Sequence, residues 1–129
     1  MHSPPPPPAD RHRNVRVLII EDEPLIAHTV EDFLIEAGFQ IAGVVGKLEN
    51  ALALIESGVC DVAIIDANLR GVSASPAATA LASRGLPFIV TSGYSQEQLP
   101  GLFPGAVFIQ KPCHPELIIQ TLATLLLNR

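Results

Sequence analysis

The sequence predicts an α/β fold in which helices cover both faces of a five-stranded parallel sheet. Five short runs rich in Ile, Val and Leu alternate with longer stretches whose apolar residues recur at helical spacing. No tight hairpin signal such as Asn-Gly joins any two of these runs, so each strand should reach the next through a helix. A doubly wound sheet with strand order 2-1-3-4-5 is a common solution for such a chain.

The first two strand–helix units occupy the N-terminal half of the chain. Residues 15–20 are rich in β-branched side chains and end abruptly in acids, which is typical of a buried strand. Pro24 suits the first turn of a helix that reaches Ala37, and Gly38 suits the position just past its end. A second strand over residues 40–45 and a helix over residues 48–56 complete this half.

The remaining three units follow the same pattern, with a shortened fourth helix. The segment 95–99 has room for about one helical turn before Pro100 and Pro104 interrupt it. The other predicted elements are strands over residues 62–65, 88–91 and 106–109 and helices over residues 76–84 and 115–127.

Composition limits the number of domains and the class of partner. The chain has 129 residues, of which 48% are hydrophobic and 16% charged, as expected for one compact domain. Residues 1–14 include five consecutive prolines and are expected to form a disordered tail before a domain over residues 15–129. The formal charge of −5 and the scattered Lys and Arg argue against nucleic-acid binding. Without a signal peptide or an apolar run of ~20 residues, we expect a cytoplasmic protein with no membrane insertion.

Polar and charged residues gather at the ends of four predicted strands. They are Glu21, Asp22 and Glu23 after the first strand, Asp66 and Asn68 after the third, Thr91 and Ser92 at the fourth, and Lys111 after the fifth. The carboxyl ends of parallel strands share one edge of the sheet, so these groups should converge there. Adjacent carboxylates repel unless a cation such as Mg²⁺ lies between them, and a lysine and a hydroxyl can hold a phosphate. Together they are the parts of a phosphoryl-transfer centre.

Each of these features also has an ordinary structural explanation. Glu21 to Glu23 could complement the N-terminus of the first helix, and Asp66 could simply begin a loop. Lys111 could be a solvated surface lysine. Their joint occurrence at the matching ends of four strands favours a functional site.

With these residues in place, the sequence resembles the receiver domain of two-component response regulators, and the likeness covers residues 15–127. It rests on the strings LIIEDEP, VAIIDANLRG, PFIVTSGY and FIQKP, and it implies a flavodoxin/CheY-like fold. The third string is similar to the Pro-Phe-x-Phe-Ala-Thr-Gly-Tyr signature of a mostly stand-alone subgroup. It departs from that signature at Val90, Thr91 and Ser92, and Cys113 stands where an aromatic residue commonly follows the Lys-Pro pair.

The resemblance implies a role for each residue at the strand ends. Asp66 would be the phosphoacceptor. Asp22 and Asp66 would hold Mg²⁺ directly together with the backbone carbonyl of Asn68, and Glu21 would act through water. Lys111 would pair with the phosphoryl group, and its peptide bond to Pro112 would be cis, which is rare among X-Pro bonds.

Further positions are implied to respond to phosphorylation. Side chains alternate along a strand, so only one of Thr91 and Ser92 can face the phosphate, and alignment with the subgroup signature favours Ser92. Phe108 stands at the rotating aromatic position of the family, although a permanently buried core residue is the alternative. Tyr94 and Asn68 would influence hydrolysis of the aspartyl phosphate.

The resemblance implies a signalling module rather than an enzyme. A sensor histidine kinase or phosphotransfer protein would phosphorylate Asp66, and slow self-catalysed dephosphorylation would reset it. No DNA-binding output domain is expected after the last helix, so output would be protein contact or phosphate relay. The apolar line Ile119, Ala123 and Leu127 is either ordinary burial or a partner face, which leaves a phosphorylation-linked homodimer open.

Three other functions share parts of this pattern. A haloacid-dehalogenase-type enzyme would carry a second Asp two residues after one at the end of the first strand, but Pro24 occupies that place. A glycine-rich phosphate loop, typical of nucleotide binding, does not follow the first strand. A receiver-like adaptor that is never phosphorylated remains a third hypothesis, because it would have the same fold.

Overall fold

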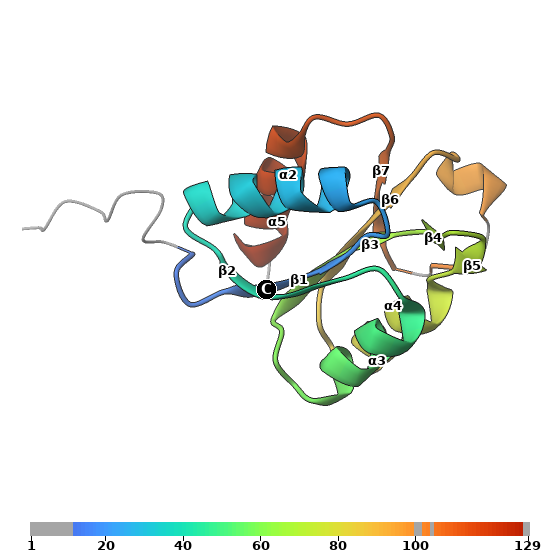
Figure 1. The fold of residues 1–129 in the computed structure, drawn as a ribbon, viewed down its shortest axis with the longest axis horizontal. Coiled ribbons are helices and arrows are strands. Elements are labelled where there is room, and N and C mark those ends of the chain that lie inside the picture. The colour runs from blue at the N-terminus through green and yellow to red at the C-terminus, as the bar shows by residue number, and fades with distance from the viewer. Residues whose placement is uncertain (1–11, 100–101, 104, 128–129) are drawn as a thin grey trace, which may run out of the picture.

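The computed structural model describes residues 12–99, 102–103 and 105–127, and its centre is a five-stranded parallel sheet (Figure 1). The strand order is β2-β1-β3-β6-β7, which is the predicted 2-1-3-4-5 order once the main strands are counted along the chain. Each neighbouring pair in the sheet is parallel. The predicted doubly wound, flavodoxin/CheY-like architecture is therefore confirmed.

The main strands and helices begin and end within one residue of their predicted bounds. The strands of the sheet are β1 (Arg16–Ile20), β2 (Gln40–Val45), β3 (Val62–Asp66), β6 (Phe88–Ser92) and β7 (Val107–Gln110). The helices are α2 (Pro24–Glu36), α3 (Leu48–Glu56), α4 (Ser75–Ser83) and α5 (Pro115–Leu127). Gly38, just beyond α2, has a φ of 97°, which explains why a glycine is placed there.

Two hydrophobic cores lie on opposite faces of the sheet. Helices α2 and α5 cover one face, and α3 and α4 cover the other (Figure 1). Leu34 of α2 and Leu122 of α5 are fully buried in the first core, and Ile55 of α3 and Leu81 of α4 are buried in the second. The central strands face a core on both sides, so their sequences are continuous apolar runs rather than alternating ones.

The connection between β3 and α4 is a small hairpin, which the sequence did not predict. Its strands β4 (Asn68–Leu69) and β5 (Val72–Ser73) pair antiparallel outside the main sheet. Arg70 and Gly71 form the turn with φ angles of 53° and 88°. Two-residue strands are too short to produce a recognisable alternation, and the turn lacks the usual Asn-Gly or Asp-Gly pair.

The fourth helix is reduced to one 3₁₀ turn, η1 (Gln96–Gln98), within the segment predicted to hold it. Pro100 and Pro104, expected to interrupt that helix, lie outside the described residues.

Most of the expected N-terminal tail, residues 1–11, also lies outside the described part of the chain. Residues 12–14, assigned to the tail from the sequence, form a turn in which the His12 ring stacks on Phe39 with centroids 4.3 Å apart. Of the helices in the described residues, none has the length and apolar character required to cross a bilayer.

Candidate functional site

Three carboxylates meet at the carboxyl edge of the sheet. Asp66 ends β3, and Glu21 and Asp22 follow β1, the neighbouring strand. One oxygen from each lies within 4.8 Å of the others. Glu21 and Asp66 are each only 8% exposed, so water screens their mutual repulsion poorly. Such a cluster of hard oxygen donors fits a divalent cation like Mg²⁺.

The end of β2 passes very close to these acids. The backbone N–H of Glu21 donates to the Val45 carbonyl at 2.9 Å. A Cβ on Gly46 would lie 3.1 Å from Cα of Asp22 and 3.4 Å from the carbonyl oxygen of Glu21. Only glycine fits at position 46 without displacing the segment that carries both acids.

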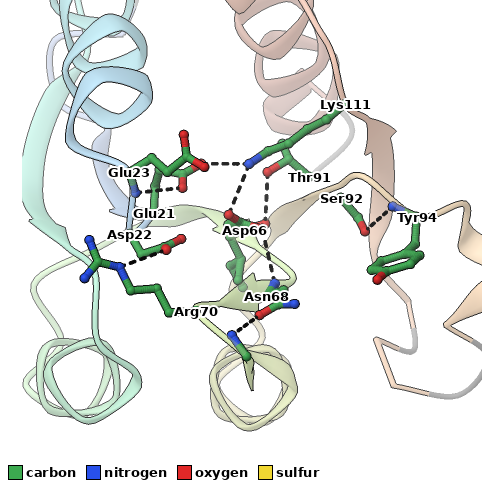
Figure 2. A network of polar contacts seen from close by, with 12 residues as sticks. Glu21, Asp22, Glu23, Asp66, Asn68, Arg70, Thr91, Ser92, Tyr94 and Lys111 are labelled. Carbon is green, nitrogen blue, oxygen red and sulfur yellow. Dashed lines mark hydrogen bonds and ion pairs between the residues drawn. The ribbon is translucent and has the colours of Figure 1, made fainter.

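Lys111 bridges two of the carboxylates. Its Nζ donates to Glu21 Oε1 at 3.0 Å and to Asp66 Oδ2 at 3.1 Å (Figure 2). Its backbone N–H donates to the Ser92 carbonyl at 2.7 Å, which fixes the residue to the end of β6. The Lys111–Pro112 peptide bond is cis, so that prediction is confirmed.

These contacts perturb the ionisation of both partners. Burial raises the pKa of Glu21 to about 7, although the hydrogen bonds from Lys111 and from the Glu23 backbone act against the rise. Burial would lower the pKa of Lys111, but its bonds to Glu21 and Asp66 outweigh that effect and raise it above 10.5. Lys111 is therefore a permanent cation at neutral pH.

The hairpin positions Asn68 beside the central aspartate. The Asn68 backbone N–H donates to Asp66 Oδ1 at 3.1 Å, and its side-chain Oδ1 accepts from the Gly71 N–H at 2.6 Å. The two oxygens of Asp66 thus have different partners, since Lys111 binds Oδ2.

A second cation, which the sequence did not indicate, reaches the acids from the hairpin tip. Arg70 Nε lies 3.3 Å from Asp22 Oδ2 (Figure 2). No pattern in the sequence could have revealed this pair, because it depends on the unpredicted turn that holds Arg70.

Thr91 and Ser92 face opposite sides of the sheet. Ser92 lines a polar cavity of about 300 Å³ together with Asp22, Asp66, Asn68 and Lys111. Its Oγ accepts a hydrogen bond from the Tyr94 N–H at 3.0 Å. Thr91 instead lines an apolar cavity between α2 and α5, and its hydroxyl donates to the Ile65 carbonyl at 3.5 Å.

The remaining predicted residues lie at the edges of this site. Tyr94 lines the polar cavity and is 53% exposed. Phe108 lies on β7, pairs with Val90 of β6 and packs against the core under α3 and α4. Its ring meets that of Phe103 edge-to-face with centroids 5.9 Å apart. Phe108 is partly buried.

Comparison with known proteins gives the family. The family model of the response regulator receiver domain matches residues 17–123. The transcriptional regulatory protein PdtaR of Mycobacterium tuberculosis is 35% identical over 85 residues, which cover 65% of this chain and 42% of the relative. The chain thus spans less than half the length of that curated relative.

Among solved structures, SdrG from Sphingomonas melonis Fr1 is similar with 41% identity and a TM-score of 0.74, covering 87% of this chain and 96% of SdrG. The BeF₃-activated conformation of SdrG has 42% identity and a TM-score of 0.72, covering 86% and 95% respectively. The family match, these relatives and the acidic cluster at the sheet edge agree: this chain belongs to the response regulator receiver domain family.

Proposed function

We propose that this protein is a phosphorylation-switched signalling module whose Asp66 accepts a phosphoryl group from a histidine kinase or a phosphotransfer protein. The observation that carries the proposal is the position of Asp66. Its carboxylate is nearly buried, lies against Lys111 Nζ at 3.1 Å, and still lines a cavity of about 300 Å³ that can admit a phosphoryl group.

The transfer is a single displacement at phosphorus. A carboxylate oxygen of Asp66 forms the new O–P bond while the P–N bond of the donor phosphohistidine breaks. The imidazole nitrogen keeps the bonding electrons and takes a proton from solvent. Lys111 pairs with a phosphoryl oxygen, and the Ser92 hydroxyl donates to another. The protein supplies position and charge, as phosphoryl transfer requires.

The acidic cluster supplies the place for Mg²⁺. Asp22, Asp66 and the backbone carbonyl of Asn68 would hold the ion, with Glu21 acting through water. When bound, the ion neutralises charge on the phosphoryl oxygens. The three carboxylate oxygens within 4.8 Å of one another support this part of the proposal.

Phosphorylation then alters contacts with other proteins. The aspartyl phosphate adds about −1.5 to −2 charges at the end of β3, which draws Ser92 and Lys111 toward it. Phe108 turns inward as the loop after β6 moves, and Asn68 and Tyr94 influence the slow hydrolysis that resets the module. The module itself is not an enzyme for an outside substrate. A phosphorylation-linked homodimer through α5 is one form of output, and the cytoplasm is the proposed location.

The relatives support this reading. SdrG, 42% identical to this chain, has a structure in a BeF₃-activated conformation. BeF₃ on a carboxylate stands in for a bound phosphoryl group, so activation of SdrG by that group favours the same chemistry at Asp66.

The proposal is tested by intact-mass analysis after incubation with acetyl phosphate and Mg²⁺. We expect a labile phosphoryl adduct on the wild type, none on Asp66→Asn, and loss of the adduct when Mg²⁺ is chelated. Asp32→Asn, on the exposed side of α2, is the matched control and should be phosphorylated like the wild type. If neither the adduct nor BeF₃ binding appears in the wild type, the protein is an adaptor that works without phosphorylation.

A further inference from the structure

The β4–β5 hairpin carries an arginine in a backbone conformation that residues with a Cβ rarely adopt. Arg70 has a φ of 53°, and Gly71 after it has a φ of 88°. The 2.6 Å hydrogen bond from the Gly71 N–H to Asn68 Oδ1 fixes this turn. A glycine or an asparagine would occupy the position of Arg70 with less strain. Backbone strain of this kind often marks a residue whose side chain has a functional role.

The turn directs Arg70 at one particular carboxylate. Its Nε lies 3.3 Å from Asp22 Oδ2, so the side chain spans from the hairpin to the end of β1 (Figure 2). The two partners differ in their surroundings, since the Arg70 side chain is 77% exposed and that of Asp22 only 13%. Asp22 is fixed in the site, whereas Arg70 can leave for solvent without disturbing the core.

Two cationic side chains, Lys111 and Arg70, pair with different carboxylates of the site. Lys111 pairs with Glu21 and Asp66. Arg70 pairs with Asp22, the remaining member of the acidic cluster. Asp22 therefore has a positively charged partner before any metal ion arrives.

We propose that Arg70 is a built-in counter-cation of Asp22, which a divalent cation must displace in order to bind. The inference rests on the proposed function, because it concerns the same metal site. A guanidinium and a divalent cation on one carboxylate would lie a few ångströms apart and repel each other. Arg70 thus lowers the affinity of the site for Mg²⁺ and relieves the repulsion among the carboxylates while Mg²⁺ is absent.

The effect of Arg70 on the Mg²⁺ affinity should be small, because its side chain is largely exposed. Ion pairs with an exposed partner are weak, so the expected change in the Mg²⁺ dissociation constant is about two- to fivefold. Arg70→Asn is the variant of choice. Asparagine tolerates a positive φ and removes the guanidinium, so the hairpin keeps its turn.

The experiment is a Mg²⁺ titration of the full chain at pH 6.5, followed by calorimetry and by the NMR signal of the Arg70 Nε–H group. In the wild type we expect that signal to shift with the same midpoint as the calorimetric binding curve. Without metal, Asp22→Asn should shift the signal in the same direction. Arg70→Asn should bind Mg²⁺ about two- to fivefold more tightly than the wild type.

Arg13→Asn is the matched control, because it removes an exposed arginine near the start of β1, at the opposite edge of the sheet. It should leave the affinity unchanged. Mg²⁺ binding with an unmoved Arg70 signal, or an equal gain in Arg13→Asn, would overturn the inference and leave the proposed function standing. If the wild type binds no Mg²⁺, both the inference and the metal-dependent part of the proposed function are wrong.

Discussion

Glu21 has a raised pKa, and this should make the free energy of unfolding depend on pH. Burial raises its pKa in the folded protein to about 7 from an ordinary value of 4.5. Between these values the folded state holds a proton that the unfolded chain has lost, so the free energy of unfolding falls as the pH rises through this window. The contribution is fully present below about pH 4.5 and is lost above about pH 7.

We therefore predict that metal-free wild type loses about 1–2 kcal/mol more stability between pH 5 and 7.5 than Glu21→Gln does, after allowance for solvent screening. Glutamine keeps an oxygen that can accept from Lys111 but has no proton to release. Urea denaturation in a chelating buffer measures the difference. Parallel pH profiles for the two proteins would show that Glu21 does not titrate in this window.

The individual site residues also differ in whether they could be predicted from the sequence alone. The acids and Lys111 were predictable because strand ends are easy to locate and parallel strands share an edge. The choice between Thr91 and Ser92 depended on a signature, since both lie at the same strand end. Arg70 was missed because its contact with Asp22 is created by a turn and by the reach of a long side chain.

Elements differ in how strongly the sequence specifies them. The helix over residues 115–127 was predicted to the residue, because Pro115 begins it and its apolar positions recur at helical spacing. The β4–β5 hairpin was missed because its two-residue strands show no recognisable alternation and its turn lacks the usual Asn-Gly or Asp-Gly pair. Long periodic segments are therefore easier to locate from the sequence than short ones.

Helix α5 allows a test of how it packs against the sheet. Leu122 is fully buried beneath it, so Leu122→Ala should lower the free energy of unfolding by about 2–5 kcal/mol through lost burial and a new cavity. Leu127, 85% exposed on the same helix, is the matched control, and Leu127→Ala should change stability by less than about 0.5 kcal/mol. Chemical denaturation measures both, and equal losses would mean that α5 packs differently from the structure.

At the scale of the whole molecule, the site lies where the two cores meet. Asp66 and Lys111 line both the polar cavity beside Ser92 and the apolar cavity between α2 and α5. A charge added at Asp66 would therefore border both cavities. Successive residues of β6 face opposite cores, with Val90 in one and Ile89 in the other. Ser92 and Phe108 belong to the side covered by α3 and α4, and this is the side on which we expect the switch to move.

Phosphorylation at Asp66 is expected to reach Phe108 on the side of the sheet covered by α3 and α4. Binding of BeF₃ and Mg²⁺ should shift the NMR signals of the Phe108 and Phe103 rings, which now meet edge-to-face at 5.9 Å. Ser92→Ala should still bind BeF₃ but lose most of the shift, because no hydroxyl is drawn toward the added group. Thr91→Val, which removes a hydroxyl on the opposite side of the same strand, should retain it. Unmoved ring signals in a wild type that has bound BeF₃ would make Phe108 a fixed packing residue and leave the output to the loops at the carboxyl edge.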